Sequence, residues 1–147
     1  MAKTLHGRNY EETARGPRLK PCAPHDVLSR LGDKWTILTL LLLAIVPGHR
    51  LRFSAIRNGI EGITQRMLTV TLRNLERDGF LTRHCYAEVP PRVEYELTAM
   101  GVSLLPALEG FTGWIREHWP LILDARRAFD EEHAFRDGPS ASASAPP

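Results

Sequence analysis

The sequence predicts a mainly α-helical fold that carries one small β-hairpin, and three observations lead to this prediction. Apolar residues recur at spacings of three and four over residues 24–46, as in a helix that packs against a core. Residues 65–78 combine leucines at the same spacings with arginines on the opposite side. Residues 81–86 and 93–97 instead alternate their side chains with a period of two, which is typical of paired strands.

Length and composition bound the class of protein. The chain has 147 residues, of which 43% are hydrophobic and 24% are charged, so we expect one domain with a buried core. No run approaches about 18 consecutive apolar residues, so we expect no transmembrane helix and no membrane partner. Two cysteines are too few for a disulfide scaffold, and the N-terminus lacks an apolar export signal, which together favour a cytoplasmic protein.

Three segments of the chain differ in composition. Residues 1–20 are polar and show no sustained period, so we expect a flexible N-terminal arm. Residues 21–135 hold all the periodic segments and form the expected folded domain. Residues 136–147 are dominated by Gly, Pro, Ser and Ala, a composition that cannot bury a core and predicts a disordered tail.

N-cap residues, prolines and glycines delimit the expected helices. We expect a first helix over residues 24–46 and a short helix over residues 53–58. Thr64 is the expected N-cap of a helix over residues 65–78, which Asp78-Gly79 ends. The apolar stripe of the first helix comprises Val27, Leu31, Trp35, Leu38, Leu42 and Ile45.

The C-terminal part is expected to be helical but interrupted. Thr98 is the N-cap candidate of an amphipathic helix that follows the hairpin. Pro106 lies inside its apolar pattern, which predicts a kink or a break there. Pro120 marks a second interruption, after which residues 121–135 form a last helix.

The helix over residues 65–78 has the character of a DNA reader. Residues 50–92 hold eight arginines and four acidic side chains, whereas residues 93–147 hold four arginines and nine acidic side chains. A basic segment suits a polyanion, and arginine binds guanine edges or phosphate. The alternative is an ordinary amphipathic helix with a solvated basic face. The candidate DNA-contacting residues of this helix are Thr64, Gln65, Arg66, Thr69, Arg73 and Arg77.

The order helix, short helix, turn, helix, hairpin, helix is that of a winged helix-turn-helix domain. In such a domain the hairpin is the wing, and Arg92 at its proline-stiffened tip lies beside the DNA backbone or in the minor groove. Arg50, Arg52 and Ser54, around the start of the short helix, are further candidate contacts to the DNA backbone. For the arginines the alternative role is surface solubility.

Six short motifs lie along residues 21–118. They are CAP at 22–24, LGDKW at 31–35, LRFS at 51–54, GITQRMLT at 62–69, LRNLERDG at 72–79 and EVPPRVEYELT at 88–98. Together they resemble the HxlR family of bacterial transcriptional regulators and, more distantly, the MarR-like regulators. The resemblance implies a homodimer on a near-palindromic operator, with the terminal helices at the interface. The interface candidates are Leu108, Phe111, Trp114, Ile115 and Trp119, whose alternative role is in the chain's own core.

The resemblance also singles out Cys22, because the corresponding cysteine senses oxidants or electrophiles in some relatives. Cys22 precedes a predicted helix N-terminus and is two residues from Lys20. Both features can lower the pKa of a thiol and so favour the reactive thiolate. Cys85 lies in the first strand of the hairpin, on the side of Leu81, where we expect it to be buried. A link between Cys22 and Cys85 is an open alternative, as is a packing role for Cys22.

These observations predict a sequence-specific regulator that binds double-stranded DNA. We expect a repressor that a small molecule, an electrophile or an oxidant releases from its operator. The alternative is a winged-helix interaction module without an operator, whose acidic C-terminal part is the working surface. Nothing in the sequence favours an enzyme, a cofactor or a metal site, because HExxH, GxSxG and Gly-rich phosphate loops are missing and the six histidines form no ligand pattern.

Overall fold

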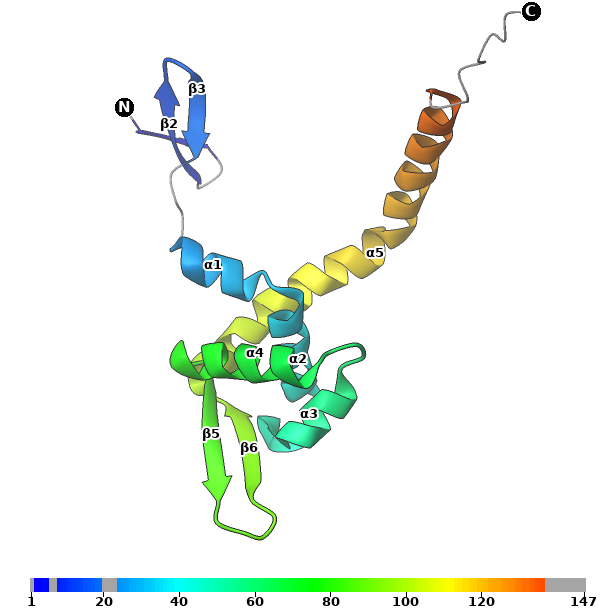
Figure 1. The fold of residues 1–147 in the computed structure, drawn as a ribbon. Helices are drawn as coiled ribbons and strands as arrows, with labels where there is room; N and C mark the ends of the chain where they lie inside the picture. The colour runs from blue at the N-terminus through cyan, green and yellow to red at the C-terminus, as the bar shows by residue number, and fades with distance from the viewer. Residues whose placement is uncertain (1, 6–7, 20–23, 137–147) are drawn as a thin grey trace, which may run out of the picture. The chain divides into compact units, whose positions relative to one another are not determined.

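The computed structural model describes residues 2–5, 8–19 and 24–136, and the chain divides into two compact units, residues 1–105 and 106–147. The predicted winged helix lies in the first unit and is confirmed (Figure 1). In chain order the elements are β1 (Ala2–Leu5), β2 (Arg8–Thr13), β3 (Gly16–Leu19), α1 (His25–Leu31), α2 (Lys34–Ile45), the 3-10 helix η1 (Pro47–His49), β4 (Arg50–Arg52), α3 (Phe53–Gly59), α4 (Gln65–Arg77), β5 (Leu81–Tyr86), β6 (Arg92–Leu97) and α5 (Ala99–Arg136).

The first predicted helix is in fact two helices, because α1 ends at Gly32 and α2 begins after Asp33. The Asp33 carboxylate accepts hydrogen bonds from the backbone N–H groups of Trp35 and Thr36, both at 3.1 Å. This N-cap satisfies two of the free donors at the start of α2 and thereby fixes a new helix start. The prediction of one continuous helix was wrong because apolar spacing alone does not register such a cap.

The buried side of α2 also differs from the predicted stripe. Thr36, Thr39, Leu40 and Leu43 are buried, whereas Ile45 is 79% exposed. Because α2 is apolar on nearly all sides, the spacing of its apolar residues does not select the buried face. Among the described residues, the largest fully buried side chains come from α2, α3 and α4, and they are Thr39, Leu40, Leu43, Ile56, Leu68 and Leu72.

Helix α4 begins and ends where the sequence predicts. The Thr64 hydroxyl accepts a hydrogen bond from the backbone N–H of Met67 at 3.1 Å, as an N-cap does. At the other end Gly79 has a φ of +83°, and the backbone N–H of Phe80 reaches back to the carbonyl of Leu75 at 2.9 Å. This is a Schellman closure, which needs the left-handed backbone that glycine adopts at no steric cost. Leu75 and two further predicted leucines of this helix are buried, which confirms the predicted core face.

The predicted hairpin is confirmed, and a third strand joins it. β5 and β6 pair in antiparallel register from Leu81 opposite Leu97 to Tyr86 opposite Arg92. The short strand β4 pairs with the other edge of β6, which gives the order β4-β6-β5. The sequence did not reveal β4, because a strand of three residues is too short to display a period of two.

Helix α5 is continuous through both of its prolines, Pro106 and Pro120. Thr98 caps it as predicted, since the Thr98 hydroxyl accepts from the backbone N–H of Gly101 at 3.1 Å. Of the predicted kink or break at Pro106, a break is therefore wrong, and so is a separate last helix after Pro120. A proline removes one backbone donor and disturbs one turn, but the neighbouring turns of a long helix keep their hydrogen bonds. Among the described helices, none is long and apolar enough to cross a membrane.

The N-terminal segment contains a small antiparallel sheet in the order β1-β2-β3. The sequence, which predicts a flexible arm over residues 1–20, shows no sign of these strands. The chain reverses into β3 at Gly16, whose φ is +105°, so short polar segments that show no period can still pair through their backbones. Cys22 and the predicted tail after residue 136 lie outside the described residues.

Candidate nucleic-acid interface

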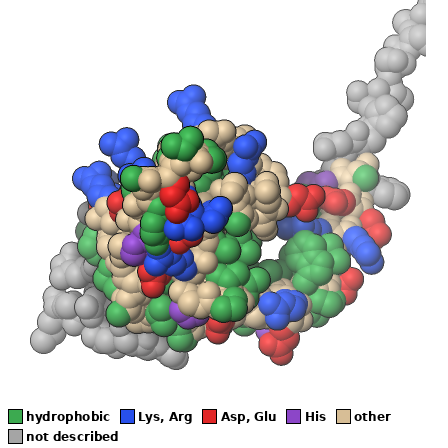
Figure 2. Space-filling model, turned by 90° about the horizontal axis from the view of Figure 1, so that it is seen from below, with side chains coloured by type: hydrophobic (Ala, Val, Ile, Leu, Met, Phe, Trp, Pro, Cys, Tyr) green, Lys and Arg blue, Asp and Glu red, His purple; other side chains and the backbone are tan. Residues whose placement is uncertain are grey.

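Helix α4 presents one face to the core and one face to solvent. Leu68, Leu72 and Leu75 point inward, whereas Arg66, Thr69, Val70, Arg73 and Arg77 are all exposed, as the sequence predicts. Among the described residues, no ion pair engages the three arginines of this face. Their guanidinium groups therefore remain available to an external anion. Figure 2 shows that basic side chains project around the side of the molecule seen from below, with acidic side chains lying among them.

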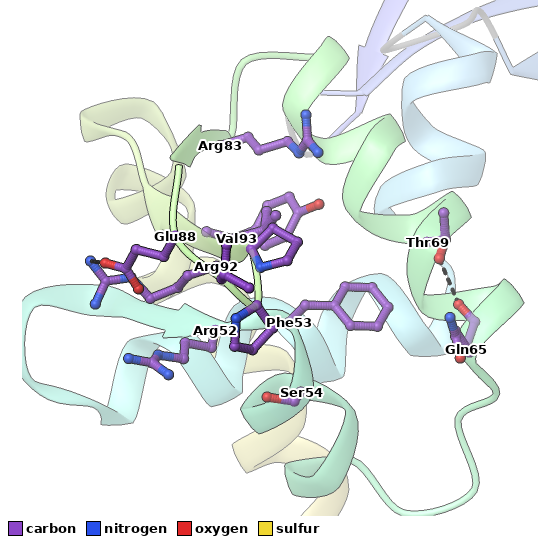
Figure 3. A pocket seen from close by; sticks show the side chains of 13 residues that line it. Arg52, Phe53, Ser54, Gln65, Thr69, Arg83, Glu88, Arg92 and Val93 are labelled. Atoms are coloured by element: carbon purple, nitrogen blue, oxygen red, sulfur yellow. Dashed lines mark hydrogen bonds and ion pairs between the residues drawn. The ribbon is translucent and has the colours of Figure 1, made fainter. Parts of the chain in front are cut away.

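The N-terminal turn of α4 uses some of its polar groups internally. The Thr64 hydroxyl oxygen accepts the capping hydrogen bond, and the Thr69 hydroxyl donates to the backbone carbonyl of Gln65 at 2.8 Å (Figure 3). Thr69 therefore offers its methyl group and an acceptor lone pair outward rather than a donor. The Gln65 side chain is exposed and makes no hydrogen bond with the described residues, so both its amide donors and its acceptor are free.

An open groove of about 650 Å³ separates α4 from the wing, which we define as the β5–β6 hairpin. Gln65 and Thr69 line it from α4, and Ser54 from the first turn of α3. Arg83 lines it from the wing and reaches from β5 toward α4 (Figure 3). Arg83 was not among the predicted site residues. The sequence signal for it was the alternation of this strand, which places Arg83 on the opposite face from Thr82 and His84.

Arg50 and Arg92, two of the predicted contacts to the DNA backbone, interact with other side chains of the chain. Arg50 is part-buried, and its Nε donates to the Glu94 carboxylate at 2.6 Å, while its Nη1 lies 3.5 Å from Glu96. Arg92 stacks on the Tyr86 ring at 4.0 Å from the ring centroid. Arg92 thus lies at the base of the hairpin loop, opposite Tyr86 in the ladder, and not at the tip of the wing as predicted.

Three arginines surround the carboxylate of Glu94. The hydrogen bond from Arg50 and the charges of Arg50, Arg92 and Arg52 hold the pKa of Glu94 below the ordinary glutamate value, although partial burial acts in the opposite direction. Arg52 itself is 59% exposed, and its Nε lies 3.8 Å from Glu94. Of the predicted backbone contacts, Arg52 and Ser54 are therefore accessible, while Arg50 and Arg92 are held by carboxylates.

Of the two candidate redox cysteines, Cys85 lies among the described residues. Cys85 is exposed on β5, so the expectation that it is buried is wrong. Burial in β5 is confined to Leu81 at its start, and the later residues of this strand are exposed or half-buried. Cys22 lies outside the described residues.

The second unit, residues 106–147, exposes a series of large apolar side chains on α5. Phe111, Trp114 and Trp119 are 55%, 54% and 43% exposed, and Ile115 is half-buried. Leu108 differs from these interface candidates because it is buried in the single chain. Exposed apolar side chains at spacings of three and four along one helix are typical of an interaction surface.

Residues 30–122 match the family model of the HxlR-like helix-turn-helix. The chain belongs to this family. An uncharacterised HTH-type transcriptional regulator of Methanothermobacter thermautotrophicus is 46% identical over 93 residues, which are 63% of this chain and 69% of that protein. The resemblance drawn from the sequence motifs is thereby confirmed.

Solved structures of similar proteins agree with this assignment. The structure of YtfH from Salmonella typhimurium matches with a TM-score of 0.66 at 32% identity, over 80% of this chain and 99% of that one. The redox regulator HypR in its reduced form matches with a TM-score of 0.61 at 34% identity, over 68% and 96% of the two chains. This HxlR-like chain is therefore a DNA-binding transcriptional regulator, and regulators of this family are not enzymes.

Proposed function

We propose that this HxlR-like protein represses transcription by binding a near-palindromic operator as a homodimer. The observation that carries the proposal is the exposed face of α4, whose arginines have no ion-pair partner among the described residues. An α-helix fits the major groove of B-DNA, and a face of free arginines supplies both guanine recognition and phosphate attraction.

Within α4 we assign base reading to Arg66 and Arg73 and phosphate contact to Arg77. Arg66 and Arg73 are seven residues apart, so they lie about 10 Å apart along one side of the helix, which is about three base-pair steps. Gln65, at the N-terminal turn, has a free amide that can pair with adenine. Thr69 presents its methyl group, which suits contact with the methyl group of thymine.

Around α4, we assign phosphate contacts to Arg52 and Ser54 at the start of α3 and to Arg83 on the wing. All three are exposed and line the groove beside α4. Such contacts fix the orientation of the helix on the duplex but carry no sequence information. Arg50 and Arg92, which the sequence also suggested, are already paired within the chain and contribute less.

Dimerisation through α5 is supported by its exposed aromatic residues. Phe111, Trp114, Ile115 and Trp119 lie at spacings of three, one and four, which places them within one broad side of the helix. Burial of such residues against a second copy removes apolar area from water and favours a two-fold symmetric contact. A two-fold axis then sets the two α4 helices in successive major grooves, about 34 Å apart.

For regulation, we propose that an oxidant, an electrophile or another small molecule releases the dimer from DNA. Cys85 is exposed on the wing, and the similar protein HypR is described as a redox regulator. Modification of a thiol on the wing adds bulk or charge close to the DNA backbone. Such a signal can act only if it binds or modifies the released state more favourably than the DNA-bound state.

A genome-wide binding map in the source organism, combined with transcript levels in its presence and absence, tests this proposal. We expect discrete sites that overlap promoters and transcripts that rise when the protein is removed. Transcripts that fall on removal would overturn the repressor role, and a map without discrete sites would overturn sequence-specific binding.

Treatment with the thiol oxidant diamide should release the wild-type protein from DNA, and Cys22→Ser and Cys85→Ser variants identify the thiol responsible. Release that persists in the double variant contradicts a thiol sensor.

A further inference from the structure

One face of the β4-β6-β5 sheet gathers basic and acidic side chains into a compact cluster. In the register, Arg52 lies opposite Glu94 and Arg50 opposite Glu96, and Arg92 precedes Glu94 by two residues on β6. Residues two apart on a strand share a face, so these side chains all project to the same side. We call Arg50, Arg52, Arg92 and Glu94 the wing-root cluster.

Glu94 lies at the centre of the wing-root cluster. Its carboxylate is 2.6 Å from Nε of Arg50, 3.8 Å from Nε of Arg52 and 3.7 Å from Nε of Arg92. Only the first distance is that of a hydrogen bond, so Arg50 is anchored while Arg52 and Arg92 are attracted by charge without a directed bond. The Glu94 side chain is 17% exposed, so the attraction is less screened than that of a fully solvated pair.

The arginines of the wing-root cluster thus differ from those of α4. Every wing-root arginine lies within 4 Å of a carboxylate, and Arg92 has a second one, Glu88, at 3.1 Å. Figure 3 shows the Arg52, Glu88 and Arg92 side chains gathered on one side of the hairpin, whereas Arg83 extends from its other side toward α4. Among the described residues, Arg83 therefore has no ion-pair partner, whereas Arg52 and Arg92, which line the same groove, each lie near a carboxylate.

We propose that Glu94 sets the sequence selectivity of DNA binding by competing with DNA phosphates for Arg52 and Arg92. This inference rests on the proposed function. A phosphate contact strengthens binding to every sequence alike, and a regulator must find its operator among a large excess of other sites. By attracting Arg52 and Arg92 without a directed bond, Glu94 weakens their phosphate contacts without abolishing them, which lowers the affinity for arbitrary DNA more than the affinity for the operator.

The variant Glu94→Gln tests this competition, since it removes the charge and keeps the size of the side chain. Fluorescence anisotropy would measure binding to a labelled random-sequence duplex and to the best selected operator duplex, at several salt concentrations. We expect affinity for the random duplex to rise about 5–10-fold near 0.1 M salt, with a salt dependence steeper by about one to two phosphate contacts. The ratio of operator affinity to random-duplex affinity should fall several-fold.

A matched control is Glu96→Gln, because Glu96 lies on the same face and contacts Arg50 and His84 but neither Arg52 nor Arg92 in the structure. We expect this variant to bind the random duplex within about twofold of wild type. The double variant Glu94→Gln/Arg52→Ala should lose about half of the gain on a logarithmic scale, because one of the two released cations is removed. An unchanged or reduced affinity of folded Glu94→Gln for the random duplex would overturn the inference, as would an equal gain from Glu96→Gln.

If Glu94→Gln does not fold, Glu88→Gln tests the same competition at Arg92. The Glu88 side chain is 51% exposed, so the fold tolerates its change. We expect a gain of about three- to fourfold for the random duplex, which exceeds the twofold range of the Glu96→Gln control. No gain would overturn the inference. A wild-type protein that binds neither duplex would instead contradict the proposed function, so the two failures are distinguishable.

Discussion

One nitrogen of Arg30, Nη1, donates to both carboxylate oxygens of Asp78, at 2.7 and 2.6 Å. Arg30 belongs to the last turn of α1, and Asp78 is the C-cap of α4. Both side chains are mostly buried, at 27% and 20% exposure. This ion pair ties the end of α4, the proposed recognition helix, to α1, across a separation of 48 residues in the chain.

Arg30→Ala is therefore expected to lower the free energy of unfolding by about 1–2 kcal/mol, since a partly buried charge-assisted pair is lost and Asp78 is left without its partner. Urea denaturation followed by circular dichroism measures this change. Arg127→Ala is the matched control, because its pair with Asp124 is 3.9 Å long and more than 70% exposed on both sides. We expect the control to cost less than about 0.5 kcal/mol. Equal effects of the two variants would contradict a structural role for Arg30.

The neighbouring residues Arg50 and Arg52 should separate stability from DNA binding. Arg50→Ala removes the hydrogen bond to Glu94 and the contact to Glu96, so we expect the midpoint of thermal unfolding to fall by a few degrees. Arg52→Ala should leave the midpoint nearly unchanged but weaken binding to all DNA sequences about 2–5-fold, with a salt slope smaller by about one. Differential scanning fluorimetry and anisotropy titrations check both. The reverse pattern would show that Arg50 is the phosphate contact.

The core of α2 contains a hydroxyl that lowers stability. Thr39 is fully buried, and its Oγ1 finds no hydrogen-bond partner among the described residues. Thr39→Val keeps the shape and removes this group, so we expect the free energy of unfolding to rise by about 1 kcal/mol. Thr36→Val is the control, because the Thr36 hydroxyl donates to Asp33 at 3.4 Å and its loss should not stabilise the fold. A Thr39→Val protein that unfolds at lower urea concentration would refute the expectation.

Acid should weaken the fold in part through Glu94. The arginines around it lower its pKa in the folded state relative to the unfolded state. Its contribution to stability is therefore complete above the ordinary glutamate pKa of about 4.3 and is lost as the pH falls through the lower folded-state value. Urea midpoints measured from pH 7 to pH 3 should fall more for wild type than for Glu94→Gln. Glu117→Gln, an exposed position on α5, should follow wild type. Parallel curves for wild type and Glu94→Gln would contradict this origin of the acid sensitivity.

The sequence predicted α4 almost to the residue because three local signals agree there. Thr64 is an N-cap, the leucines follow the helical period, and Gly79 allows the left-handed backbone that closes the helix. The wing was predictable for a similar reason, since its strands alternate and its prolines lie between them. A segment can be predicted from sequence when its local signals agree with the fold.

Other features depend on contacts between distant segments. The buried face of α2 is selected by its neighbours, because this helix is apolar nearly all round. The engagement of Arg50 and Arg92 by Glu94 depends on the register of β4 against β6, and β4 is too short to be recognised. Arg83 was overlooked because its role depends on which side of the hairpin faces α4.

The central claim is that the arginine face of α4 reads DNA sequence as part of a symmetric dimer. Repeated selection of bound duplexes from a random pool, followed by sequencing, tests it most directly. For wild type we predict an enriched motif with two-fold symmetry and half-sites one helical turn apart. Arg66→Ala and Arg73→Ala should each cost about 1–3 kcal/mol on that motif, and the double variant should lose the motif. Arg116→Ala/Arg127→Ala, at exposed positions on α5, should retain it. The same motif enriched by the Arg66→Ala/Arg73→Ala variant, or no motif with wild type, would contradict the account.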